Sequence, residues 1–256
     1  MLRLAKNIGC LLIGAACAMP IVIGPADARD QEAEYKACLL LTKREPEMAF
    51  ESALSWKADG GGFPARHCVA LALVAQKKFH LAAPRLEALA EDMRKTGSPL
   101  LIPTLSQAAN VWLLAEDYSR ANAVASAALE IDPDNINLLI DRSRILARAN
   151  NYQSAFNDLN QALRLDPTRT DALTFRAAAW RQLGNNERAL EDVELALSLT
   201  PDLLDALVER GILYRLTDQP DLARKDWLKV LELSPHSPTG EAARINLEKL
   251  DVNPNK

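Results

Sequence analysis

The chain has 256 residues, of which 48% are hydrophobic and 25% are charged, and its formal net charge is −4. This composition is typical of a globular protein with a buried core. Because no surplus of basic residues exists to neutralise phosphates, the composition argues against nucleic acid as a partner. Few glycines and aromatic residues, together with abundant alanine and leucine, favour helices over a turn-rich β architecture.

The N-terminus has the features of an export signal. Arg3 and Lys6 form a short positively charged region at the start of the chain. An apolar stretch follows at residues 8–23, and Ala26 and Ala28 are small residues at the two positions that a signal peptidase recognises. We therefore expect cleavage after Ala28 and a mature protein that is periplasmic or secreted.

Two alternatives to a cleaved signal remain open. The first is an uncleaved membrane anchor that faces the periplasm, although Pro20 and several small residues make this stretch a poor spanning helix. The second is a lipoprotein modified at Cys17, although Gly14 stands where a leucine-like residue is usual. In either case the signal or anchor is the only segment that the sequence predicts to contact a membrane.

Four columns of residues recur in one phase in the second half of the chain. The period is 34 residues, which is the length of one helix-turn-helix unit. Small residues let two antiparallel helices approach closely, and proline ends the second helix of each unit. The columns are Pro133, Pro167, Pro201 and Pro235; Ala121, Ala155, Ala189 and Ala223; Ala128, Ala162, Ala196 and Val230; and Leu129, Leu163, Leu197 and Leu231.

This pattern resembles that of the tetratricopeptide-repeat (TPR) family. The family has a large residue at position 4 of each unit, small residues at 8, 20 and 27, an aromatic residue at 11 and proline at 32. The unit at 170–203 follows it with Leu173, Ala177, Trp180, Ala189, Ala196 and Pro201. The resemblance implies an all-α fold, a right-handed α-solenoid with repeats at 102–135, 136–169, 170–203 and 204–237 and a C-terminal capping helix.

The flanking segments fit the same architecture less closely. Residues 29–101 keep part of the pattern and are expected to form two divergent capping units, since terminal repeats are usually atypical. Residues 238–256 should form a capping helix over Gly240–Leu250, followed by a tail. The predicted organisation is therefore a signal peptide at 1–28, divergent units at 29–101, four repeats at 102–237 and a cap at 238–256.

Two cysteines, Cys38 and Cys68, remain after the expected cleavage. An even pair of cysteines in an exported protein predicts one disulfide. Both lie on the expected first helices of neighbouring divergent units, which pack side by side in a solenoid. The alternatives are two free buried thiols, or a metal site that includes His67 but lacks a further ligand in the sequence.

The resemblance also implies a groove for a protein or peptide partner, lined by the first helices of the units. The alternative is that its apolar residues pack between adjacent first helices. Arg144 is expected to pair with Asp171, while three other arginines follow one edge. We expect a partner segment with apolar anchors and an acidic flank. The groove residues are Ile140, Phe175, Ala178, Val208, Ile212 and Leu216, and the edge residues are Arg148, Arg181 and Arg215.

The sequence offers no set of residues that suggests an enzyme, a cofactor site, a metal site or a small-molecule substrate. Its three histidines lie far apart, and no glycine loop for phosphate or dinucleotide binding is present. The favoured function is a non-catalytic periplasmic scaffold or adaptor in a bacterial cell envelope. The alternatives are an outer-membrane lipoprotein subunit of a secretion, pilus or cell-wall machine, and a regulatory subunit of an envelope enzyme.

Export is directly testable. N-terminal sequencing of the protein recovered from the periplasm should begin at Arg29, because signal peptidase cuts after the small-x-small pattern. A mature protein that retains Met1, or that begins at a lipidated Cys17, contradicts this cleavage site.

Overall fold

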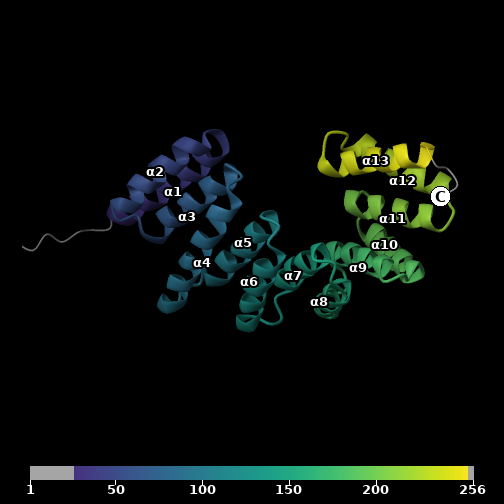
Figure 1. Ribbon diagram of the computed structural model, residues 1–256, viewed down its shortest axis with the longest axis horizontal. Helices are drawn as coiled ribbons and strands as arrows, with labels where there is room; N and C mark the ends of the chain where they lie inside the picture. Colours follow the sequence, from purple (N-terminus) through teal and green to yellow (C-terminus); the bar gives the residue numbers. More distant parts are fainter. Residues whose placement is uncertain (1–25, 253–256) are drawn as a thin grey trace, which may run out of the picture.

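The computed structural model describes residues 26–252, and this part of the chain contains thirteen α-helices and no strand. Successive helices pair as hairpins, and α13 packs on the last pair (Figure 1). The all-α solenoid predicted from the sequence is confirmed. The helices are α1 (Ala26–Arg44), α2 (Pro46–Ala58), α3 (Gly62–Ala75), α4 (Phe79–Thr96), α5 (Leu101–Leu114), α6 (Tyr118–Ile131), α7 (Ile136–Arg148), α8 (Tyr152–Leu165), α9 (Thr170–Gln182), α10 (Asn186–Leu199), α11 (Leu204–Leu216), α12 (Pro220–Leu233) and α13 (Pro238–Val252).

The turn inside each of the four regular units uses a left-handed residue at the same place. The backbone φ there is positive, which glycine and asparagine adopt most easily. In three units an Asp or Asn follows, and its side-chain oxygen accepts a hydrogen bond from a backbone N–H of the next helix. The left-handed residues are Glu116, Asn150, Gly184 and Asp218.

The alanine columns are where the two helices of each unit meet. Ala121, Ala155 and Ala189 are each at most 1% exposed, because they face the partner helix at close range. The last unit shows how little space remains between its two helices. A Cβ atom on Gly211 would lie 2.4 Å from Nε1 of Trp227, so this position tolerates only glycine unless the indole moves.

The divergent units differ from the regular ones in length. The helix α4 has 18 residues, whereas α6 has 14, so the extra residues before Pro99 lengthen the second helix by about one turn. Gly97 ends α4 in the left-handed conformation. At the other end, α13 covers the expected 240–250 and extends two residues beyond it on each side.

A series of buried ion pairs also repeats every 34 residues, a feature that the repeat columns did not predict. An arginine on the first helix of a unit donates from Nε and Nη2 to an aspartate on the second helix. The aspartates are between 4% and 7% exposed. The pairs are Arg142–Asp158 at 2.7 Å, Arg176–Asp192 at 2.6 Å and Arg210–Asp226 at 2.7 Å.

Two of these arginines also reach the preceding unit. Nη1 of Arg142 donates to the Ser126 hydroxyl on α6, and Nη1 of Arg176 donates to the Asn160 side chain on α8. Hydrogen bonds to Asp158 raise the pKa of Arg142 above its ordinary value, so the guanidinium stays charged. These two pairs, Arg142–Asp158 and Arg176–Asp192, therefore each join three helices and link one unit to the next.

Removing one partner of an ion pair should lower the free energy of unfolding more than removing both partners. Asp192→Val leaves the Arg176 guanidinium, whose side chain is 23% exposed, without its carboxylate, and should lower the free energy of unfolding by about 3 kcal/mol. The first regular unit has Ala108 and Val124 at these two positions. The double variant Arg176→Ala/Asp192→Val copies that apolar pair and should therefore lose less.

Urea unfolding of the native chain and of both variants measures the difference. If the double variant is as unstable as Asp192→Val, the unpaired charge is not the cause of the loss.

Candidate functional site

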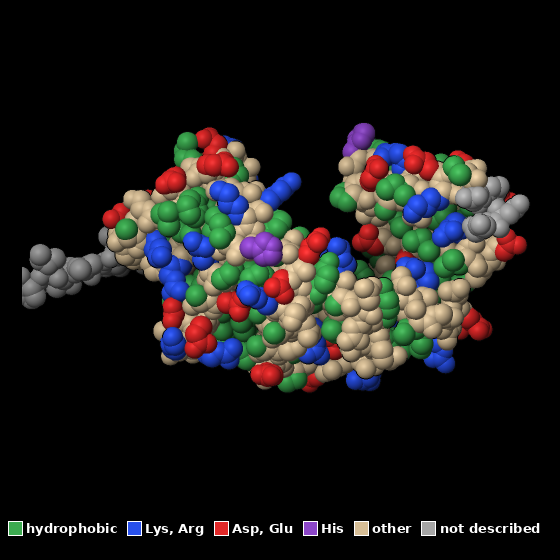
Figure 2. Space-filling view, viewed as in Figure 1, with side chains coloured by type: hydrophobic (Ala, Val, Ile, Leu, Met, Phe, Trp, Pro, Cys, Tyr) green, Lys and Arg blue, Asp and Glu red, His purple; other side chains and the backbone are tan. Residues whose placement is uncertain are grey.

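The helices form an open arc, with α1–α3 on one arm and α11–α13 on the other (Figure 1). Figure 2 shows the molecule deeply hollowed between these two arms. The first helices α5, α7, α9 and α11 contact one another in sequence along the arc. This row of helices is where the sequence analysis expected a groove.

A cavity of about 340 Å³ lies between α7, α8 and α9, and we call it the central pocket. Four of the predicted groove and edge residues meet in it: Phe175 and Ala178, with Arg148 and Arg181. Other residues of these helices and of α5 complete its lining: Leu113, Ser143, Arg144, Ala147, Tyr152, Ala155, Leu159, Ala179 and Gln182. The pocket therefore joins an apolar floor to a set of arginines.

The contacts of Arg144 differ from those predicted. Its guanidinium lies 3.5 Å from the carboxylate of Asp141 on the same helix, and 5.9 Å from the ring centroid of Phe175. Asp171 instead accepts from Arg169 at 2.8 Å. The predicted Arg144–Asp171 pair is therefore wrong. Arg169 lies at the start of α9, only two residues from Asp171, and forms the ion pair with that carboxylate.

Arg181 is the second correction. Its Nε donates to Oε1 of Glu209 on α11 at 2.5 Å, and Glu209 is 7% exposed. The charge of Arg181 is thus neutralised inside the protein and is not free for an acidic partner. Arg148 differs, because it is exposed and forms no ion pair with another residue of the described chain.

The remaining predicted groove residues lie outside the central pocket. Ile140 is 5% exposed and belongs to the core, so the alternative of packing between first helices describes it correctly. Val208 and Ile212 on α11 are half-buried against the core, whereas Leu216 is 47% exposed. Arg215 is half-buried on the same helix.

A second cavity, of about 450 Å³, lies where α1, α3, α4 and α5 meet, and we call it the N-terminal pocket. Its walls are largely apolar and include Phe63, Met93 and Leu100. No repeat register pointed to it, because it lies mainly in the divergent units. The one sequence signal close to it is His67, which adjoins Cys68 in the chain.

A chain of hydrogen bonds crosses the N-terminal pocket. The Tyr35 hydroxyl lies 2.6 Å from Nδ1 of His67, and Nε2 of His67 lies 2.5 Å from Oε1 of Gln107. A neutral ring with its proton on Nε2 satisfies both bonds. Burial lowers the pKa of His67, against an opposing effect of the bond to Gln107, and burial raises the pKa of Tyr35.

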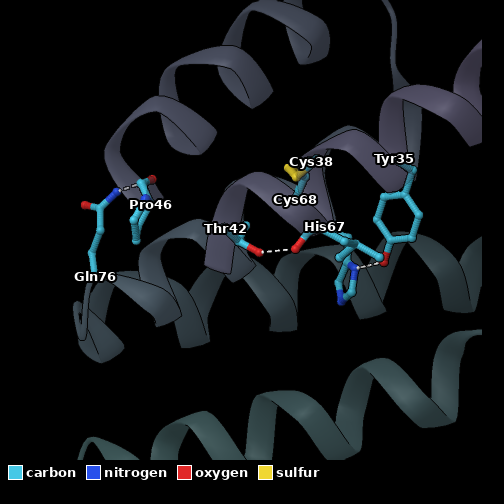
Figure 3. Close-up of a disulfide and its surroundings, with 8 residues drawn as sticks. Tyr35, Cys38, Thr42, Pro46, His67, Cys68 and Gln76 are labelled. Atoms are coloured by element: carbon cyan, nitrogen blue, oxygen red, sulfur yellow. Dashed lines mark hydrogen bonds between the residues drawn. A yellow bond between two sulfur atoms is a disulfide. The ribbon is translucent and has the colours of Figure 1, made fainter. Parts of the chain in front are cut away.

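Cys38 and Cys68 form a disulfide close to Tyr35 and His67 (Figure 3). Their Cα atoms are 6.3 Å apart, which is within the range for a disulfide, and both residues are buried. The bond fastens α1 to α3. It therefore holds Tyr35, on α1, in reach of His67, on α3.

The predicted cleavage site after Ala28 falls within α1, and the apolar stretch at 8–23 lies outside the described residues. Within residues 26–252, no helix is both long and apolar enough to cross a membrane.

Comparison with known proteins bears on the fold. The tetratricopeptide-repeat family profile matches residues 110–180. No curated protein matches the chain in sequence. Among solved structures, PilF of Pseudomonas aeruginosa is similar with a TM-score of 0.60 at 14% identity, over 86% of this chain and 98% of that one.

Two further structures share the arrangement of helices. A tetratricopeptide-repeat protein from Parabacteroides merdae has a TM-score of 0.58 at 20% identity, over 75% of this chain and 80% of that one. YrrB, described as a TPR protein with an unusual peptide-binding site, has a TM-score of 0.50 at 19% identity, over 77% of this chain and 97% of that one. At these identities the likeness concerns the fold.

The half-buried imidazole of His67 predicts acid sensitivity at the N-terminal end of the solenoid. Burial lowers the pKa of His67 in the fold, whereas in the unfolded chain the ring binds a proton below about pH 6.5. The unfolded state therefore gains protons first as the pH falls, and the free energy of unfolding should fall by at most about 1.4 kcal/mol per pH unit.

Thermal unfolding between pH 7.5 and 5.5 should show a shallower pH dependence for His67→Gln than for the native chain. His80→Gln, which replaces an exposed histidine, is the matched control. Equal slopes for the native chain and His67→Gln would show that the ring does not titrate in this interval.

Proposed function

Because this chain belongs to the tetratricopeptide-repeat family, whose fold is a scaffold for protein–protein interaction, we propose that its central pocket holds a segment of a partner protein. The observation that carries this proposal is the pocket itself, where the Phe175 ring and the Ala178 methyl group meet Arg148 and Arg144. An aromatic floor beside exposed guanidinium groups fits an apolar side chain with a carboxylate nearby.

The contacts of the pocket arginines narrow the kind of partner segment that fits. Arg181 is held by the buried Glu209 at 2.5 Å, whereas Arg144 lies 3.5 Å from Asp141 and its side chain is 45% exposed, so Arg148 and Arg144 are the arginines that can reach an acidic group of a partner. Arg144 also lies near the Phe175 ring, so it can contact the apolar anchor and the acidic group together. We infer a short segment with one apolar anchor and one acidic residue next to it.

The lining of the pocket supports binding rather than catalysis. Its serine, Ser143, is 1% exposed and donates its hydroxyl to the carbonyl of Ile140 at 2.7 Å. This hydroxyl is therefore buried and already engaged in a hydrogen bond. The peptide-binding site named for YrrB, a structure similar in fold, is in keeping with a peptide partner.

We infer a periplasmic, non-catalytic adaptor of the bacterial cell envelope. Two features support this location: the export features of residues 1–28 and the Cys38–Cys68 disulfide. Disulfides persist in oxidising compartments and are rare in the cytosol, so the bond agrees with export.

A photocrosslinker in the pocket tests the proposal. Placed at Gln182, which is exposed and lines the pocket, it should capture a discrete set of envelope peptides, and Phe175→Ala should reduce the yield about tenfold or more. The same group at the exposed Gln153, outside the pocket lining, provides the background.

Arg148→Glu should also reduce capture, because it repels an acidic flank. Arg164→Glu makes the same charge change on the exposed face of α8 and should have little effect. If Phe175→Ala leaves capture unchanged, or if it unfolds the protein, the binding site lies elsewhere and Phe175 belongs to the core.

A further inference from the structure

The two ends of the solenoid are finished differently. At the C-terminal end α13 packs on α11 and α12. At the N-terminal end no described helix covers the outer side of α1 and α2, and a groove of about 310 Å³ runs between them. Terminal repeats normally present a polar outer face, because nothing stacks on them.

The centre of this end face is apolar. Leu40 on α1 is 60% exposed, and Met48 on α2 is 54% exposed. Leu41 and the half-buried Trp56 line the groove between the helices. Exposed apolar clusters of this kind mark surfaces that another molecule covers.

The part of α1 that lines the groove has a symmetric order. Its six lining residues lie in pairs at equal distances on either side of position 39. Glu34 is matched by Arg44, and the small Ala37 is matched by Leu41. The innermost pair is Cys38, which faces the core in its disulfide, and Leu40.

Such an order is what a two-fold axis requires. In an isologous contact, residue i of one copy meets residue j of the other, and j meets i. If two copies of α1 cross antiparallel with the axis at residue 39, Glu34 of each copy faces Arg44 of the other. Ala37 then faces Leu41, so a small residue meets a large one and the helices can pack closely.

The charged groups at the ends of the groove are available for this contact. Neither Glu34 nor Arg44 forms an ion pair with another residue of the described chain. Their charges are opposite, so two copies in the antiparallel arrangement gain two equivalent ion pairs at the rim of an apolar centre. A partner of one charge sign would leave one end of the groove mismatched.

We propose that the α1–α2 end face binds a second copy of this chain, which makes the protein a two-fold symmetric dimer. The dimer seals the open end of each solenoid and covers Leu40 and Met48. It also presents two central pockets in one molecule, so that a partner with two copies of the recognised segment binds with increased apparent affinity.

Charge exchange at the rim tests this dimer. Sedimentation equilibrium of the full chain should show a reversible dimer, and Glu34→Arg should weaken it about tenfold or more, because it sets Arg against Arg at both ends. Arg44→Glu should act similarly. The double variant Glu34→Arg/Arg44→Glu recreates opposite charges and should restore the affinity.

Leu40→Ala should also weaken the dimer. Leu81→Ala, at a leucine 50% exposed on α4, is the matched control and should not. Phe175→Ala should leave the dimer intact. The dimer and the binding of a partner in the central pocket can therefore be tested separately, and either proposal can fail without the other.

Three results would overturn the proposal. One is a native chain that stays monomeric at every concentration. Another is a dimer whose affinity is unchanged by Glu34→Arg and by Arg44→Glu, which would point to contacts elsewhere, such as the apolar stretch at 8–23. The third is a double variant as weak as the single ones although circular dichroism shows all of them folded.

Discussion

The close approach of the two helices within each unit is the constraint on which the rest of the structure depends. Alanine at the contact, as at Ala155 and Ala189, allows the helices to meet with almost no exposed surface. The approach is closest at Gly211, because the Trp227 side chain occupies the space that a Cβ atom at position 211 would need. A constant spacing within units lets the units stack in a regular row, and the first helices then share one side of the arc.

The ion pairs and the disulfide determine how neighbouring units sit on that row. Arg142 and Arg176 each bridge an aspartate of their own unit and a polar side chain of the preceding one. A buried pair of this kind adds little net stability over an apolar pair, but its fixed geometry disfavours other arrangements. Among the described residues of the divergent first unit no such ion pair occurs, and the bond between Cys38 and Cys68 fastens this unit to the next one.

The two surfaces with a proposed partner differ in what creates them. The central pocket lies where α7, α8 and α9 converge, so it is a product of the repeat geometry. The end face exists because the row of units stops at α1 and α2. One surface suits a short segment with an apolar anchor, and the other suits an identical surface. They lie in different units, so both can be occupied together.

The sequence by itself determined the period, the turns and the all-α class, because these depend on local backbone preferences and on residues repeated in one phase. The tertiary structure alone decided the partners of the long side chains. Arg181 reaches Glu209 and Asp171 is taken by Arg169, and such choices depend on distances between helices that sequence spacing does not specify. The N-terminal pocket likewise required the packing of divergent helices, where no repeated register fixes which faces meet.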